Sequence, residues 1–179
     1  MGFDSETAFE SALIKCLVEE KGWKDGVIKY PTEKDLLDNW AKIIFENNRD
    51  IDRLGDFPMT DGEMAQIMGQ IAKLRTPLNL NGFINGGTVQ IIRDNENDTH
   101  NFKKTISLKI FDRNEIAAGR TRYQIAQQPK FKAKNSIYPN RRGDFCLLIN
   151  GMPVIHVELK KSNVPVSEAQ YQIRKYLYE

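Results

Sequence analysis

Two carboxylates and a lysine near the end of the chain have the types and the spacing for metal-assisted phosphodiester chemistry. Asp144 opens an apolar run, an Asn150-Gly151 turn signal follows, and a second apolar run ends in Glu158-Leu159-Lys160. Side chains alternate along a strand, so Glu158 and Lys160 emerge on one face. Carboxylates can hold a divalent cation that activates water. If the two runs form a hairpin, Asp144 lies beside Glu158, and two carboxylates and the Lys160 ammonium meet at one point, where a cation could activate water against a phosphodiester.

The turn between the two runs decides whether Asp144 and Glu158 meet. A two-residue loop at Asn150-Gly151 would place Asp144 opposite Val157 and turn Glu158 to the other face. A three-residue loop, or a β-bulge in one strand, would place Asp144 opposite Glu158. Gly151 readily adopts the left-handed conformation that such loops use. We expect adjacent antiparallel strands whose carboxylates share one cation.

Composition indicates a globular chain with one sizeable core. The chain has 179 residues, of which 40% are hydrophobic and 28% charged. No stretch reaches the roughly 18 apolar residues of a membrane-spanning helix, and the N-terminus lacks the apolar core of a signal peptide. Cys16 and Cys146 both sit in apolar patterns, which indicates reduced core residues. We expect a cytoplasmic bacterial or archaeal protein without membrane association.

The basic residues are concentrated in one part of the chain. The net charge is only +2, but the stretch from Asn101 to Arg142 holds eleven Lys or Arg residues and two acids. A charge run is commonly just a solvated surface. This one leads directly to Asp144, so we predict that it contacts the phosphate backbone of DNA. The residues assigned to that contact are Lys130, Lys132, Arg141 and Arg142.

Periodicity and capping signals predict the elements that must position these residues. Thr60 and Glu63 have capping-box spacing, as do Ser167 and Gln170. Two β-rich runs flank a polar loop and predict a hairpin. Helices followed by an antiparallel meander and a closing helix indicate an α+β fold. The predicted helices run from Asp4 or Ser5 to about Lys21, Glu33 to Asn47, Met64 to Leu74 and Ser167 to about Leu177, and the hairpin strands are Thr88–Arg93 and Thr105–Ile110.

Other constellations are weaker. Asn85-Gly86-Gly87 lacks the lysine and the helix that would make it a phosphate loop. His156 shares the predicted face of Glu158, yet an ordinary half-exposed strand residue has the same pattern. Glu158 and Lys160 would also fit a simple salt bridge at a strand end. The residues alone leave these alternatives open.

The residues around the cluster closely resemble the nuclease core of the restriction (R) subunits of type I restriction-modification enzymes, which are PD-(D/E)XK nucleases. The resemblance is weak between Gly22 and Thr76, and Gly143 stands where the family usually has proline. The matching segments are Arg141-Arg142-Gly143-Asp144, Asn150-Gly151-Met152-Pro153, Val157-Glu158-Leu159-Lys160, the Q-x-x-x-Y pair Gln172 and Tyr176, and, further upstream, Glu6-x-x-x-Glu10, Asn101-Phe102 and Gln127-Gln128.

This resemblance implies a restriction-endonuclease-like core, with a central mixed or antiparallel sheet flanked by helices. Asp144 and Glu158 would bind Mg²⁺, and Lys160 would orient or polarise the attacking water. Gln172 and Tyr176 would support the site. Glu10 would approach the metal as a third carboxylate, unless it is an ordinary exposed helix acid. We expect one nuclease domain over residues 1–179, with a helical part at about 1–76 and a nuclease core at about 84–179.

R subunits are much longer and carry ATP-driven motor domains, so the chain is expected to be a fragment of such a subunit. The parent would cleave double-stranded DNA with modification and specificity subunits as partners, and ATP would bind outside this domain. Two other classes stay open. One is a stand-alone PD-(D/E)XK repair or junction nuclease, and the other is a non-catalytic DNA-binding or docking module.

Overall fold

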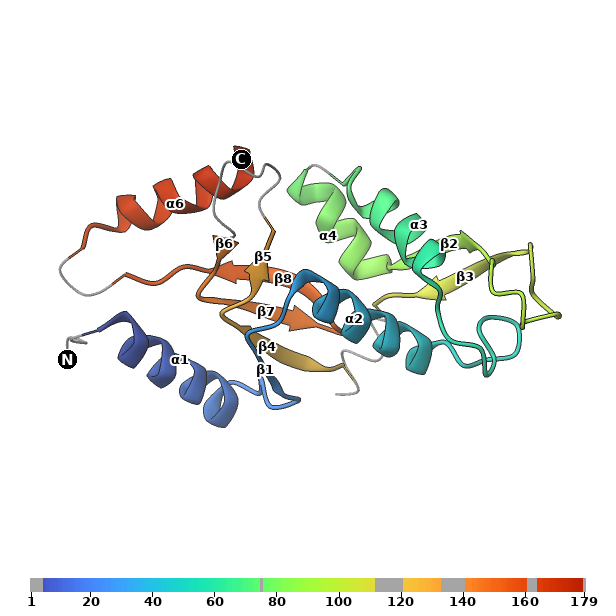
Figure 1. Cartoon of the computed structure of the whole chain (residues 1–179), viewed down its shortest axis with the longest axis horizontal. Coiled ribbons are helices and arrows are strands. Elements are labelled where there is room, and N and C mark those ends of the chain that lie inside the picture. The colour runs from blue at the N-terminus through green and yellow to red at the C-terminus, as the bar shows by residue number, and fades with distance from the viewer. Residues whose placement is uncertain (1–4, 75, 112–120, 133–140, 161–163, 179) are drawn as a thin grey trace. The chain divides into compact units, whose positions relative to one another are not determined.

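The computed structural model describes residues 5–74, 76–111, 121–132, 141–160 and 164–178 (Figure 1). The backbone divides into two compact units, one comprising Met1–Leu36 with Arg122–Glu179 and the other Leu37–Thr121. The first unit combines the beginning of the chain with its last third, because a strand pairing joins the two.

A four-stranded sheet forms the centre of the first unit. Its strands are ordered β1 (Val27–Lys29), β4 (Tyr123–Gln127), β7 (Phe145–Ile149) and β8 (Met152–Val157). β1 runs parallel to β4, whereas the β4–β7 and β7–β8 pairs are antiparallel. The predicted α+β fold with a mixed central sheet is therefore confirmed.

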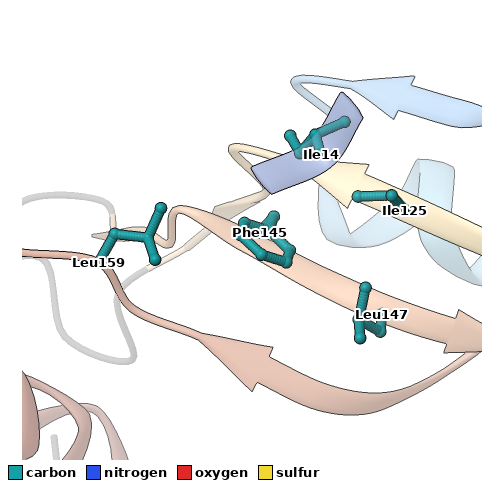
Figure 2. Close-up of a cluster of buried hydrophobic side chains, with 5 residues drawn as sticks. All are labelled: Ile14, Ile125, Phe145, Leu147 and Leu159. Atoms are coloured by element: carbon teal, nitrogen blue, oxygen red, sulfur yellow. The ribbon is translucent and has the colours of Figure 1, made fainter. Parts of the chain in front are cut away.

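Helices pack on this sheet through apolar side chains. Ser5 caps α1 (Glu6–Glu20) by accepting a hydrogen bond of 3.1 Å from the Ala8 amide, as its residue type predicts. Ile14 of α1 is buried in a cluster that also contains Ile125, Phe145, Leu147 and Leu159 (Figure 2). A second cluster joins Leu36 of α2 (Glu33–Asn47) to Ala126, Cys146 and Leu148. Alternate residues of β7 enter the two clusters, so its near-continuous apolar sequence reflects burial on both faces.

The remaining elements of the first unit are small or terminal. β5 (Lys130–Phe131) and β6 (Arg141–Arg142) pair with each other in a separate two-stranded sheet. The predicted closing helix is α6 (Val166–Tyr178). Both cysteines are free thiols, and burial raises the pKa of Cys146 to about 11. Within the described ranges, no helix is long and apolar enough to cross a membrane.

The second unit contains the predicted hairpin, formed by β2 (Thr88–Ile92) and β3 (Thr105–Lys109). These strands make a two-stranded sheet of their own, so the predicted antiparallel strands are divided between this hairpin and the β4–β7–β8 pairs of the first unit. The capping box of Thr60 and Glu63 is present and starts α3 (Asp61–Ile71). The sequence did not predict α4 (Pro77–Gly86), whose N-cap is Thr76.

A buried ionic cluster lies at the centre of the second unit. Arg93 has no exposed side-chain surface, and its Nη1 donates to both Glu63 carboxylate oxygens at 2.8 and 2.7 Å. Arg93 Nε donates to Asp98 at 2.9 Å, and further guanidinium bonds go to the Phe57 and Pro58 carbonyls. Glu63 therefore caps α3 and also pairs with Arg93, the residue that follows β2. This pair links the helix to the hairpin.

Candidate active site

The turn between β7 and β8 is a two-residue loop. A β-bulge in the hairpin restores the alignment of Asp144 with Glu158 that this loop length alone would prevent. Asn150 and Gly151 have φ angles of +49° and +85°, and Ile149 pairs with Met152. Two left-handed residues are typical of the tight hairpin turn that an Asn-Gly sequence favours. The expected three-residue loop is absent. The second expected route is present, because the register shifts between Leu147 and Leu148.

The bulge lies in β8 at Val154. Leu147 pairs with Ile155 and Leu148 with Pro153, so one residue of β8 has no partner in β7. Phe145 consequently pairs with Val157. Asp144 precedes Phe145 and Glu158 follows Val157, so both acids lie at the open end of the hairpin, next to this last pair.

Asp144 is a half-buried carboxylate among other acids. Its Oδ2 accepts a hydrogen bond from the Leu159 amide. Burial raises the pKa of Asp144, and the nearby Glu158 and Glu10 carboxylates raise it further. The Leu159 hydrogen bond and the Lys160 charge offset only part of this effect. Two neighbouring acids therefore disfavour ionisation of Asp144 at this end of the sheet.

Lys160 forms the cationic part of the cluster. Its Nζ lies 3.2 Å from Glu158 Oε1, and the side chains are 18% and 3% exposed. Burial disfavours the charged form of Lys160, but the hydrogen bond and charge of Glu158, with Glu6 and Asp144, outweigh burial and raise its pKa. Lys160 is consequently an ammonium at neutral pH and cannot serve as a base in this state.

Glu10 of α1 is buried at 3% exposure, so it is not an exposed helix acid. Its Oε1 accepts from Gln127 Nε2 at 2.7 Å, and its two oxygens accept from Gln128 Nε2 at 3.2 and 2.9 Å. The sequence placed Gln127-Gln128 in the resemblance but gave the pair no role. A polar pair at the end of a strand carries no signal of a partner more than a hundred residues earlier.

These groups line one hollow of about 260 Å³ in the first unit. The hollow brings the three predicted catalytic residues together with Glu10 and Gln128. The other lining residues are Glu6, Thr7, Arg142 and Gly143.

The donor set fits a hard divalent cation. The carboxylate groups of the hollow offer oxygen atoms as metal ligands. One of them, Glu158 Oε2, is buried without a hydrogen-bond partner and lies 3.7 Å from His156 Nε2. Within the described part of the chain, no group of three or more acidic, His or Cys side chains has the arrangement of a complete metal site. Mg²⁺ commonly takes one or two carboxylates and keeps several waters, which this hollow has room for.

Of the predicted basic residues, the structure places Arg142 at the hollow. Arg142 lines it and pairs with Lys130 across β5 and β6. Arg142 Cζ and Lys130 Nζ lie 5.5 and 5.9 Å from the centre of the exposed Tyr30 ring, which the sequence did not single out. Lys132 is exposed. The Arg141 side chain and residues 112–120 and 133–140 of the basic stretch lie outside the described part.

The two predicted supporting residues belong to α6, which the sequence predicted correctly. Gln172 and Tyr176 are four residues apart on this helix and share one face. Their side chains lie outside the described part of the chain. Their role at the site stays a prediction.

Comparison with known proteins identifies the family. The sequence profile of the family described as "Type I restriction enzyme R protein N terminus" matches residues 4–179. The chain belongs to this family. The resemblance to type I R subunits seen around Asp144 is thus confirmed over almost the whole chain.

Curated relatives of this R protein N terminus are named endonuclease subunits. The type I restriction enzyme SsaAORF53P endonuclease subunit of Staphylococcus saprophyticus is 28% identical over 180 residues, which is 98% of this chain. The SauCOLORF180P endonuclease subunit of Staphylococcus aureus is 28% identical over 178 residues. The chain spans 17% of the length of each of these relatives.

The raised pKa of Asp144 predicts that this R protein N terminus loses stability when the carboxylate ionises. Because the folded pKa lies above the ordinary aspartate value of 3.8, the folded state binds the proton more tightly than the unfolded state. Asp144→Asn keeps an acceptor for the Leu159 amide and cannot ionise. We expect the variant to be more stable than wild type at neutral pH in metal-free buffer.

The stability difference should shrink as the pH falls through the raised folded pKa, and it should vanish below about 3.8. Urea denaturation of both proteins across this range measures it. A variant that is no more stable than wild type at neutral pH would show that the Asp144 charge is not strained by its surroundings.

Proposed function

We propose that this chain is the nuclease domain of a type I restriction enzyme R subunit and that it hydrolyses double-stranded DNA with Mg²⁺. The observation that carries the proposal is the bulged β7–β8 hairpin. It delivers Asp144, Glu158 and Lys160 to one hollow, which Glu10 also lines. The named function of the curated relatives supports the same reading.

Asp144 and Glu158 would hold the cation, which would supply Lewis-acid stabilisation and a more acidic bound water when present. Lys160 contributes a fixed positive charge, since its pKa is raised and Glu158 holds its ammonium in place. A preorganised cation of this kind stabilises charge that develops on the phosphoryl oxygens. Water activation by a neutral Lys160 does not fit this protonation state.

The DNA backbone would approach over the basic residues beside the hollow. Arg142 lines the hollow and Lys130 pairs with it across β5 and β6. The assignment of Lys132 and Arg141 to the same contact rests on the sequence. Phosphate contacts of this type position a duplex without reading its sequence. The proposal therefore assigns sequence recognition to other parts of the enzyme.

The double variant Lys130→Ala with Lys132→Ala should weaken duplex binding and flatten its salt dependence. Each lost phosphate contact lowers the slope of log affinity against log salt by about 0.9, so we expect a decrease of about 1 to 2. Fluorescence anisotropy with duplex DNA at several salt concentrations measures this slope. An unchanged slope would remove the two lysines from the DNA surface.

The matched control is Lys21→Ala with Lys24→Ala. Both lysines are exposed and belong to the first unit. Lys21 is the C-cap of α1, about 16 Å along the helix axis from Glu10. Lys24 precedes Asp25, whose amide donates to Tyr123 at the start of β4, the end of that strand opposite to Gln128. This control should leave the slope unchanged, because it removes the same charge away from the hollow.

In the parent enzyme, ATP would drive separate motor domains, and modification and specificity subunits would be the partners in the cytoplasm. Cleavage by the assembled parent with substitutions at Asp144, Glu158 or Lys160 tests the proposal. Cutting by this chain alone with Mg²⁺ and no ATP would instead favour a stand-alone nuclease. Duplex binding that Asp144→Ala does not change, with no cleavage by any assembly, would favour a docking module.

A further inference from the structure

Two consecutive glutamines hold the Glu10 carboxylate at the edge of the hollow. Gln127 and Gln128 donate three hydrogen bonds of 2.7 to 3.2 Å to its two oxygens. Both donors are neutral amides, which stabilise a carboxylate without cancelling its charge. The groups that hold Glu10 are therefore amides rather than cations that would compete with a metal ion for its oxygens.

The backbone of Gln128 explains how two neighbours reach the same group. Consecutive side chains of a strand point to opposite faces. Gln128 follows the last residue of β4 and has a φ of +51°, in the left-handed region that residues with a Cβ rarely adopt. This conformation breaks the alternation, and both amides contact Glu10. Sparsely populated backbone conformations are often found at functional sites.

Gln128 also contacts the segment that carries Asp144. Its main-chain amide donates to the Asp144 carbonyl at 2.7 Å, while its side chain holds Glu10. One residue therefore joins the end of β4, the start of β7 and α1. A change in its position would move two of the acids that line the hollow.

The side-chain oxygen of Gln128 is buried and has no hydrogen-bond partner. A buried polar atom without a partner is uncommon in a folded protein. Gln128 lines the same hollow as Asp144 and Glu158, so water held there can donate to this oxygen. This observation is independent of the hydrogen bonds to Glu10.

We propose that Gln128 is a positioning residue that holds the Glu10 carboxylate toward Asp144 and Glu158, so that the three acids bind one divalent cation together. The inference rests on the proposed function, since it assigns a metal to this hollow. Gln127 assists through the same carboxylate but does not line the hollow. Gln128 acts through Glu10 and does not touch the reacting atoms.

The test is Mn²⁺ binding to the 179-residue chain. The electron paramagnetic resonance signal of free Mn²⁺ measures how much of the ion is unbound. Gln128→Leu should weaken binding about tenfold to a hundredfold, as is typical when a group that orients a metal ligand is lost. In a Glu10→Gln background, Gln128→Leu should have no further effect, because the group it positions is already gone. Additive losses would overturn the inference.

Gln66→Leu is the matched control. The Gln66 amide makes two hydrogen bonds with the Ile92 backbone, of 2.9 and 2.8 Å, in the second unit. Its loss should lower the unfolding midpoint without changing Mn²⁺ affinity. If Gln128→Leu does not fold, Gln128→Asn serves instead, since its amide ends one methylene short of Glu10 and should weaken binding in the same way.

Asp144→Ala distinguishes an error in the role of Gln128 from an error in the proposed metal site. If it abolishes Mn²⁺ binding while folded Gln128→Leu and Gln128→Asn bind as tightly as wild type, the role of Gln128 is wrong and the proposed site stands. If Asp144→Ala binds Mn²⁺ like wild type, the proposed metal site is wrong as well.

Discussion

In the full-length parent proposed above, with partner subunits, ATP and Mg²⁺, Asp144→Ala, Glu158→Ala and Lys160→Ala should each lower DNA cleavage a hundredfold or more. Each change removes a proposed metal ligand or the ammonium that stabilises developing charge. ATP hydrolysis and translocation should continue, because the motor would be a separate domain. Asp144→Ala and Glu158→Ala should stay folded, since losing one of several neighbouring acids relieves repulsion.

Plasmid cleavage and phosphate release, assayed on the same preparations, test this expectation. Persistent cleavage by the Glu158→Ala enzyme would show that the cluster is not the nuclease site. A parallel loss of ATPase activity would show general damage to the enzyme. Lys21→Ala, an exposed change near the far end of α1, provides the unaffected reference.

The second large effect concerns stability and involves a different part of the chain. Arg93→Ala should lower the free energy of unfolding by about 3 to 5 kcal/mol. The guanidinium pairs with Glu63 and Asp98, and the three side chains are 0%, 0% and 3% exposed. Its removal leaves two buried carboxylates without a cation. It also leaves the Phe57 and Pro58 carbonyls without their guanidinium donors.

Arg49→Ala is the control for this change. Arg49 pairs with Asp56 at the surface, where the side chains are 57% and 83% exposed. Solvent screens such a pair, so its loss should cost less than about 1 kcal/mol. Urea denaturation of both variants gives the comparison. Equal and small losses would mean that the Arg93 cluster relaxes or admits water when it is broken.

The sequence predicts this protein well where the signals are local. Ser5 caps α1, and the box of Thr60 and Glu63 starts α3, because each cap involves residues only three positions apart. The β2–β3 hairpin is also predicted, since its strands flank a polar loop. The family resemblance, inferred mainly from residues around Asp144 and Glu158, is also confirmed, because the family profile matches residues 4–179.

What the sequence did not predict depends on distant partners. β1 has three residues and exists through its parallel pairing with β4, almost a hundred positions later. Short β4 carries no alternation signal, because three consecutive residues of it are buried. The sequence left Glu10 as either a third carboxylate or an exposed helix acid, and its burial against Gln127 and Gln128 excludes the second. Each of these features requires knowing which segments meet in the folded chain.

Because of the bulge at Val154, the candidate site depends on whether insertions or deletions in the β7–β8 hairpin comprise an odd or an even number of residues. Between Leu147 and Glu158, a gain or loss of two residues can be absorbed by the turn while each side chain keeps its face. A change of one residue would let every backbone pair form again, yet it would send Glu158 and Lys160 to the side of the sheet away from Asp144. A homologue that differs by one residue in this hairpin would thus keep the architecture and lose the chemistry.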